Sequence, residues 1–497
     1  MLKAIHRVIA ILPAVLLQFL WWHLIYNVFQ QYAQIINFLL SIAAFLLVIW
    51  MVVKRTDSTY RILWLLILLL FPLPGAFLYL LFGDKRSGIP LKKKLDKTII
   101  DYHVQDDIYH EGIQKKHLRM SQSIKYLSDQ TQMPLLPMKD AKYYPLGDDL
   151  YVDLLEDLKK AEKTILIEYF IVEDGQMWEG IEKILEEKVK QGVKVYFMYD
   201  DLGSLSTFSR HELKELKKKG IHAISFNPLM KITGTLNYRD HRKMTIIDGK
   251  VCYSGGINLA DEYINVIVKH GHWKDIGFRL TGAPVYNYTK MFLQFWNAFS
   301  NEKIDLETIT YEQPQEYAQG YCMSWYDSPL SEEAHSNQFF IDCLNQATSY
   351  VYFYTPYLML GDELLEAFTD AARRGVDVRI IVPGIPDKKV IYRMSQSYYP
   401  PLLKAGVKIY SYTKGFVHAK AMMVDDIVCT IGTVNLDYRS LFLHFENNSM
   451  FYDSHMLIDL KQDFLTTQAQ CKEEKIGRYG TIRFVTDGIL RILSPLC

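Results

Sequence analysis

The stretch Tyr238-Arg-Asp-His-Arg-Lys-Met-Thr-Ile-Ile-Asp-Gly249 has a second copy in Phe416-Val-His-Ala-Lys-Ala-Met-Met-Val-Asp-Asp426, and this pair decides the fold. Each copy has the spacing His-x-Lys-x4-Asp and leads to a Gly-x-x-Asn at the same offset. The residues are His241, Lys243, Asp248 and Asn258 in the first copy and His418, Lys420, Asp425 and Asn435 in the second. A single His-x-Lys is common by chance, whereas two copies with matching offsets are not. The sequence therefore predicts a duplicated unit with half of one site in each copy.

Short apolar strands alternate with amphipathic helices around each copy, in the same order in both halves. Strands are predicted at 161–170, 192–200 and 220–226 and again at 347–356, 375–382 and 406–410, with helices at 178–190 and 364–374. Such alternation is typical of a sheet with helices on both faces. The predicted fold is α/β, with two αβα sandwich halves related by a pseudo-twofold axis. The motif strands, Met244 to Asp248 and Ala421 to Asp425, would each have their histidine at the strand entrance.

Two long apolar runs near the N-terminus predict a helical hairpin in a membrane. Val8 to Phe29 and Ile35 to Val53 are each long enough to span a hydrocarbon core of about 30 Å. A cleaved signal peptide fits the first run poorly, because the run is too long and no small-x-small cleavage site follows it. With a third apolar run, these segments predict an all-α membrane anchor over residues 1–84.

The third run, Ile62 to Phe82, is interrupted by Phe71-Pro-Leu-Pro-Gly75, which breaks the helical hydrogen-bond ladder. Basic residues at 54–61 and 85–94 flank the run, so the positive-inside rule places both flanks in the cytoplasm. The preferred interpretation is a re-entrant or interfacial helix–break–helix, which keeps the rest of the chain cytoplasmic. A proline-kinked third span, which would put the following domains outside, is the alternative.

The remaining chain is predicted to comprise a basic juxtamembrane linker at 85–135, a first half at 136–305 and a second half at 306–497. The cluster Leu91-Lys-Lys-Lys-Leu-Asp-Lys97 either attracts anionic lipid headgroups or is a solvated helix face. The amphipathic C-terminal stretch at 482–493 either lies on a membrane surface or packs on the core. A formal net charge of zero disfavours nucleic-acid binding. Six scattered cysteines predict free thiols and no zinc site.

Two histidines and two lysines brought together predict a site for a phosphate diester. One imidazole can attack phosphorus while the other protonates the leaving oxygen. Lys243, Lys420 and the amides of Asn258 and Asn435 would hold the non-bridging oxygens as the transition state spreads charge over them. No metal and no other cofactor is predicted, because the cations are built into the chain.

Each neutral imidazole needs an acceptor that orients its second ring nitrogen. Asp275 and Glu446 follow the motif in their respective halves and are predicted to be these acceptors, so Asp275 is expected to orient His241. Asp248 and Asp425 complete the two catalytic motifs. We expect these two aspartates to fix a turn and pair with nearby donors, not to act as general bases.

The two motifs closely resemble those of the phospholipase D superfamily, and a resemblance to bacterial cardiolipin synthases extends over nearly the whole chain. Further similar stretches are Leu70 to Gly75, Leu78 to Gly83, Tyr199 to Ser204, Thr355 to Tyr357, Ser397 to Pro400, Asn435 to Ser440 and Ser494 to Leu496. The resemblance implies transfer of a phosphatidyl group from one phosphatidylglycerol to another, with release of glycerol, through a covalent phosphatidyl-histidine. By analogy His241 is the nucleophile and His418 the acid and then the base. The residues themselves do not distinguish these roles.

The resemblance also implies two phospholipase D-like halves, a multi-pass location in a bacterial inner membrane, and phosphatidylglycerol and anionic lipids as partners. It indicates no oligomeric state. Hydrolysis of phospholipid stays an alternative, because the acceptor that reaches the intermediate can be water or a lipid hydroxyl. The zero net charge and the anchor disfavour a membrane-tethered nuclease, and the intact motifs disfavour a lipid-binding scaffold with a decayed site.

Overall fold

The computed structural model describes residues 30–53, 57–71, 88–100, 107–228, 237–309, 311–314, 319–477 and 480–496, with isolated positions between 19 and 83. The chain forms two compact units. The smaller unit comprises Met1–Pro90 and Thr481–Cys497, and the larger comprises Leu91–Gly480.

The smaller unit contains helix α2, Ala33–Val53, whose side chains Phe38, Phe45 and Val53 are exposed. Within the described residues, one helix is long and apolar enough to cross a membrane, over Gln34–Val53. The span predicted at 35–53 therefore coincides with a helix of suitable length and composition. The span predicted at 8–29 falls almost entirely outside the described residues, so the structure does not support the predicted multi-pass topology.

Helix α3, Ser58–Leu70, covers the first part of the broken apolar run. It starts at Asp57, whose side chain accepts hydrogen bonds from the backbone N–H groups of Thr59 and Tyr60, and it ends at Phe71. Its 13 residues measure about 20 Å, which is too short to cross a bilayer core.

The chain after this break returns along α3. The ring of Tyr79 lies 5.2 Å from that of Trp64, and the Tyr60 hydroxyl donates to the carbonyl oxygen of Gly83 at 2.9 Å. This return is what a re-entrant helix–break–helix requires. The last helices, α18 (Thr481–Leu493) and η7 (Ser494–Leu496), belong to the same unit, and both contact α3.

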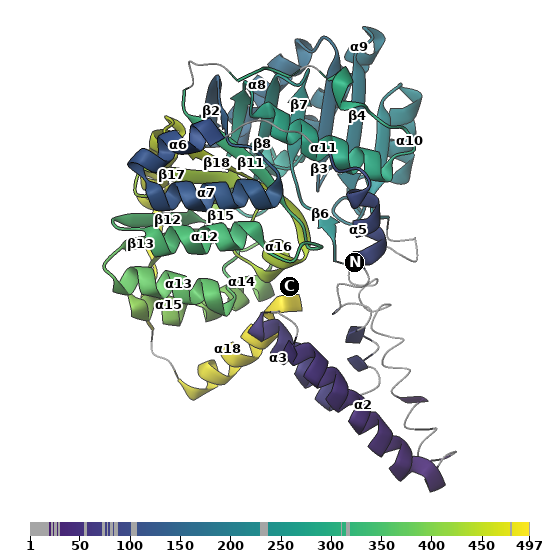
Figure 1. Ribbon diagram of the computed structural model, residues 1–497, viewed down its shortest axis with the longest axis vertical. Helices are drawn as coiled ribbons and strands as arrows, with labels where there is room; N and C mark the ends of the chain where they lie inside the picture. The colour runs from purple at the N-terminus through teal and green to yellow at the C-terminus, as the bar shows by residue number, and fades with distance from the viewer. Residues whose placement is uncertain are drawn as a thin grey trace. The chain divides into compact units, whose positions relative to one another are not determined.

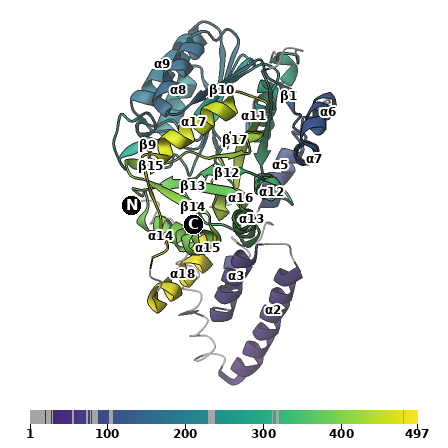
Figure 2. The same ribbon diagram turned by 90° about the vertical axis from the view of Figure 1, so that its left-hand side faces the viewer.

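The larger unit is built on two mixed sheets. The first contains β2 (Asp140–Tyr144), β3 (Thr164–Tyr169), β4 (Lys194–Asp200), β5 (His222–Phe226), β7 (Met244–Ile247), β8 (Val251–Gly255) and β10 (Gly277–Thr281). The second contains β1 (Leu136–Pro137), β11 (Tyr321–Asp327), β12 (Tyr350–Tyr354), β13 (Asp377–Pro383), β14 (Lys408–Tyr412), β16 (Ala421–Val424), β17 (Val428–Gly432), β18 (His444–Tyr452) and β19 (Cys471–Glu473). Figures 1 and 2 show these strands from two directions.

The two sheets have the same strand order. The first runs β2-β10-β8-β7-β3-β4-β5, and the second runs β11-β18-β17-β16-β12-β13-β14 with β1 and β19 added at its edges. In both, the last three strands of that order are parallel and the others antiparallel. The predicted duplication and the predicted motif strands are therefore confirmed, with β7 and β16 in the centre of their sheets.

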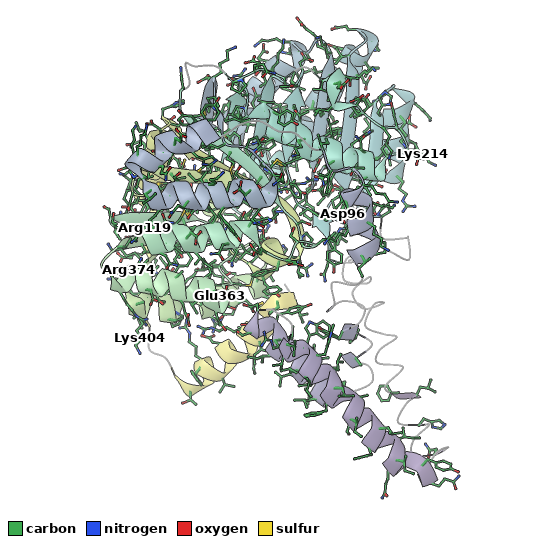
Figure 3. All side chains as sticks on the ribbon, viewed as in Figure 1. Asp96, Arg119, Lys214, Glu363, Arg374 and Lys404 are labelled. Carbon is green, nitrogen blue, oxygen red and sulfur yellow. The ribbon has the colours of Figure 1, made fainter. Side chains whose placement is uncertain are left out.

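Helices cover these sheets. The first half has α8 (Gly147–Lys159), α9 (Gln176–Lys190), α10 (Arg210–Lys218) and α11 (Val285–Phe299), and the second has α12 (His335–Gln346), α13 (Asp362–Arg373), α14 (Lys389–Ser397), α15 (Tyr399–Ala405), α16 (Tyr438–Phe442) and α17 (Met456–Gln468). Helix α11 contacts β7, β8 and β11, and α17 contacts β2, β14 and β16 to β18, so both lie between the halves. In Figure 3, charged residues labelled on the covering helices, such as Lys214 and Glu363, are exposed.

The segment predicted as a juxtamembrane linker, 85–135, is largely helical. It contains α5 (Ile89–Asp96), α6 (Asp107–Lys116) and α7 (Leu118–Thr131). Helix α7 buries Met120, Ile124 and Leu127 and contacts α12 and β11. These residues form one narrow apolar stripe in an otherwise charged segment, which explains why the sequence indicated a linker there.

Two short parallel pairings join the halves. Strand β6 (Arg239–Asp240) pairs with the start of β18, up to Asp240↔Phe445. Strand β9 (His272–Lys274) pairs with β15 (Gly415–Val417), up to Lys274↔Val417. Each pairing ends one residue before a motif histidine and one residue before an acid of the opposite half. The strand register therefore brings histidine and acid together across the interface.

Gly415 permits the close approach of β9 and β15, because a Cβ atom there would lie 2.1 Å from the carbonyl oxygen of His272. We expect Gly415→Ala to separate these strands, with an overpacking cost of about 1–3 kcal/mol. The thermal midpoint of the detergent-solubilised protein and its activity should both fall. Gly112→Ala is the control, since its Cβ would meet nothing within 4 Å in helix α6. Equal midpoints for the two variants would contradict the tight contact.

Candidate active site

The two histidine motifs meet where the halves are joined. His241 Nδ1 lies 2.9 and 2.8 Å from the two carboxylate oxygens of Glu446. His418 Nδ1 lies 2.6 Å from Asp275 Oδ2. All four side chains are buried. Since each Nδ1 is directed at an acid, Nε2 of each ring is the nitrogen left for chemistry.

The acid partners are exchanged between the halves, which corrects one prediction. Asp275 was expected to orient His241 of its own half, but it contacts His418, and Glu446 contacts His241. The physical reason is that each histidine continues a parallel pairing with the opposite half. Sequence order indicates that an acid follows each motif, but it contains no information on which histidine that acid reaches.

Both motif lysines are buried beside their histidines. Lys243 Nζ donates to the carbonyl oxygen of His241 at 2.7 Å, and Lys420 Nζ donates to that of His418. Burial lowers the pKa of Lys243 to about 8 and the pKa of Lys420 to about 7, although the buried carboxylates act in the opposite direction. An anion entering the site would favour the charged form of both ammonium groups.

The two imidazoles differ in how well they can carry a proton. Burial and then the neighbouring cations, Lys243 first, hold the pKa of His241 well below its ordinary value. Burial and Lys420 lower the pKa of His418 to about 4, but Asp275 opposes them. Burial raises the pKa of Asp275, yet His418 and Lys420 outweigh burial and leave it below the ordinary value. His418 therefore faces an ionised carboxylate that stabilises its protonated form.

Glu446 is held by two hydroxyl groups as well as by His241. Ser440 Oγ donates to Oε1 at 2.5 Å, and Thr433 Oγ1 donates to Oε2 at 2.5 Å. Burial nevertheless raises the pKa of Glu446 to about 8, against the effects of Lys243 and these hydroxyl groups. The two acids thus have opposite pKa shifts, and the site is not electrostatically symmetric.

Asp248 and Asp425 lie at the far ends of the motif strands. The Asp248 carboxylate accepts from the backbone N–H groups of residues 162–164 at 2.7–2.8 Å, and Asp425 accepts from those of residues 348–350 at 2.7–2.9 Å. Each ties the turn after the motif strand to the start of the neighbouring strand, β3 for Asp248 and β12 for Asp425. The expectation that these aspartates pair with nearby donors is confirmed.

The two asparagines are held by the protein in different ways. Asn258 Oδ1 accepts from the Ile171 N–H at 3.1 Å, and its Nδ2 donates to the Tyr263 hydroxyl at 2.6 Å. The Asn435 backbone N–H donates to Ser440 Oγ at 2.9 Å, while its Oδ1 is buried without a hydrogen-bond partner. Binding of phosphate by these amides stays a prediction.

Two aromatic groups of the site were missed in the sequence. The Phe170 ring lies edge-on to His241, with centroids 4.8 Å apart. The His444 ring lies 5.8 Å from that of His241, and its Nε2 is buried without a hydrogen-bond partner. The equivalent position in the other half is Trp273, 5.5 Å from His418. An aromatic ring two residues before each acid is the signal that could have indicated His444 and Trp273, whereas no such signal marks Phe170.

Among the described residues, His241, His444 and Glu446 offer three ligand atoms within 4.8 Å of one another. A metal there would have to displace the hydrogen bonds that already occupy both oxygens of Glu446. It would also face the neighbouring lysine ammonium groups. The donor set therefore suits an oriented histidine better than a resident metal ion.

The segments of the chain that form this site match a known protein family. Residues 154–294 and 340–467, which include both motifs and both acids, match the family described as "Cardiolipin synthase, PLD-like domain". The chain belongs to the cardiolipin synthase family. It is therefore an enzyme of the phosphatidyltransferase class. Residues 39–83 match a second family, described as "Phospholipase_D-nuclease N-terminal".

Relatives match along most of their length. An uncharacterized protein of Streptococcus mutans serotype c is 43% identical, over 86% of this chain and 93% of its own. Cardiolipin synthase 2 of Bacillus anthracis is 32% identical, over 92% of this chain and 90% of its own. The crystal structure of phosphatidylserine synthase from Haemophilus influenzae covers 76% of this chain and all of its own at 13% identity, with a TM-score of 0.56. That likeness supports the two-half fold alone.

We expect Asp248→Ala to reduce stability and not the chemistry. The substitution leaves three backbone N–H groups without their acceptor, at a cost of about 2–4 kcal/mol. Urea unfolding of the solubilised protein should show a lower midpoint, and activity per folded molecule should be retained. His418→Asn is the control, which should keep the urea midpoint of the wild type and lose its activity. An unchanged midpoint with lost activity in Asp248→Ala would contradict the structural role.

Proposed function

We propose that the protein is a membrane-bound cardiolipin synthase that transfers a phosphatidyl group from one phosphatidylglycerol to another and releases glycerol. The observation that carries this proposal is the pair of exchanged histidine–acid contacts, which joins two imidazoles and two buried lysines in one site. The choice of substrate is supported by relatives named cardiolipin synthase, such as that of Bacillus anthracis.

In the first half-reaction, His241 Nε2 attacks the phosphorus of phosphatidylglycerol. A bond forms between nitrogen and phosphorus, and the bond from phosphorus to the headgroup glycerol oxygen breaks. Protonated His418 gives its proton to that oxygen, so glycerol leaves as a neutral alcohol. This assignment is supported by the ionised Asp275, which stabilises the protonated form of His418, and by the cations that disfavour protonation of His241.

In the second half-reaction, the headgroup hydroxyl of another phosphatidylglycerol takes the place of glycerol. His418, now neutral, accepts the hydroxyl proton while the oxygen attacks phosphorus and the phosphorus–nitrogen bond breaks. Cardiolipin is released and both histidines return to their starting states. The reaction is reversible, because the phosphorus–oxygen bond broken in the first half-reaction is replaced by an equivalent phosphorus–oxygen bond in the second.

Lys243 and Lys420 stabilise the phosphoryl group during both steps. Their lowered pKa values mean that the empty site carries less positive charge than its residue types imply. The anionic diester favours protonation of both lysines, so the charge is greatest when the substrate is bound. The amides of Asn258 and Asn435 are proposed to add neutral donors.

We further propose a multi-pass location in a bacterial inner membrane, with the catalytic halves on the cytoplasmic side. The length and composition of Gln34–Val53 support a span, and the return of the chain along α3 supports a re-entrant segment. Phosphatidylglycerol and other anionic lipids are the expected partners, and no nucleic acid is expected.

The direct test is incubation of the purified protein with phosphatidylglycerol vesicles as the sole substrate. Cardiolipin and glycerol should form in equal amounts. His241→Ala and His418→Ala should each lower turnover by roughly 10³-fold or more, because each removes an essential step. His211→Ala, at an exposed position in α10, is the control and should retain activity. Phosphatidic acid as the sole product would instead indicate a hydrolase.

Binding of orthovanadate, a phosphate analogue, should be accompanied by proton uptake at pH 7. In the empty site the pKa of His418 is about 4, below the ordinary value, so the ring is neutral and gains a proton only when the anion raises that pKa. Affinity should therefore weaken as pH rises. Calorimetry in two buffers of different ionisation enthalpy measures the uptake.

Asp275→Asn should reduce this uptake, because it removes the carboxylate that stabilises protonated His418. A smaller uptake at Lys420, whose pKa is about 7, should remain in both proteins. Equal uptake by the wild type and Asp275→Asn would contradict the assignment of His418 as the proton carrier.

A further inference from the structure

Helix α18 exposes apolar side chains and buries polar ones. Phe484, Val485 and Ile489 are 69%, 52% and 53% exposed. Asp487 and Ser494, in the same segment, are only 3% and 2% exposed. A helix of a water-soluble domain shows the reverse pattern, because burial of its apolar stripe is what stabilises it.

An apolar stripe and a charged stripe run along different sides of α18. Val485, Ile489 and Leu493 follow one another at intervals of four residues, so they share one face. The charged residues at 483, 487 and 491 have the same spacing and share the other face. Arg483 Nε lies 3.9 Å from Asp487 Oδ2 on that side. The apolar stripe therefore contains no charged residue.

The neighbours of α18 are the apolar helices of the smaller unit. Helix α18 packs on α3, whose Leu69 and Leu70 are 73% and 70% exposed. Both helices belong to the unit that contains the span-length helix α2. Helix α18 thus lies against a helix that also exposes apolar side chains. With 13 residues each, α18 and α3 are too short to cross a bilayer.

We infer that the outward face of α18, formed by Val485, Ile489 and Leu493, inserts into the hydrocarbon of one membrane leaflet beside α3. A lipid bilayer is the partner that fits, because it accepts an uninterrupted apolar stripe and needs no polar complement. On the opposite stripe, Asp487 stays buried against protein. The larger unit, Leu91–Gly480, is consequently attached to the membrane through both of its ends. Both attachments lie on one side of the bilayer, since α18 does not span it.

The experiment uses the full-length protein in phosphatidylcholine–phosphatidylglycerol vesicles, with one cysteine at position 489 carrying an environment-sensitive NBD fluorophore. Cys471 and Cys497 are replaced by serine, and the other four cysteines are buried. The Ile489→Cys probe should show blue-shifted emission and be quenched by lipids brominated in their acyl chains. The control is Ile458→Cys in α17, an isoleucine that is 71% exposed in the larger unit, and it should not be quenched.

Two results would overturn the inference that α18 inserts into the membrane. Emission typical of water at position 489 would overturn the inference. Blue-shifted emission without quenching by brominated lipid would show that protein, either a second copy or the larger unit, covers this face, and would also overturn it. If Ile489→Cys does not fold, as judged by cardiolipin formation, Val485→Cys on the same stripe carries the same expectation.

Discussion

The parallel pairing of two short strands with the opposite half is the constraint on which the site depends. Neither β6 nor β9 belongs to the sheet of its own half. Main-chain hydrogen bonds hold each of them to a strand of the opposite half, β6 to β18 and β9 to β15. Because backbone register is discrete, a shift by one residue would move a histidine away from its acid altogether. The histidine–acid pairs His241–Glu446 and His418–Asp275 are therefore positioned by the joint between the halves. Asn447 reinforces this joint, since its side chain accepts from the Lys243 N–H and donates to Ser254 Oγ.

The two copies of the motif reach the same geometry by different means. In the first, Arg242 lies 2.5 Å from Glu168 and 2.9 Å from Asp240, and Arg239 lies 3.0 Å from Asp200, all within the buried interior. In the second, the equivalent positions hold Ala419 and Phe416, which pack without charge. Buried ion pairs contribute little net stability but are costly to break singly, so they hold one arrangement against alternatives. The nucleophile assigned to His241 thus sits in the more rigidly specified strand.

Much of this arrangement could be predicted from the chain, and the failures have physical reasons. The alternation of strands and helices and the duplication followed from apolar periodicity and from the repeated spacing around His241 and His418, which are local properties. The exchange of Asp275 and Glu446 did not follow, because it depends on which strands pair across a tertiary interface. Helix α7 was missed because a few buried residues such as Ile124 suffice to dock it. The hydroxyl contacts of Ser440 and Thr433 with Glu446 also arise from tertiary packing, since Ser440 lies in α16 and Thr433 directly follows β17.

The exchanged acids also bear on how such a chain can be divided. Each half contains one motif histidine, and its acid contacts the histidine of the other half. A single half taken alone would therefore have an imidazole without its acid partner. Such a half becomes complete only when a second copy supplies the missing carboxylate in the same crossed manner. Fusion of two copies into one chain makes that supply permanent and allows the two halves of the site to diverge. The opposite pKa shifts of Asp275 and Glu446 are such a divergence, in which the pKa of one acid is lowered and that of the other is raised.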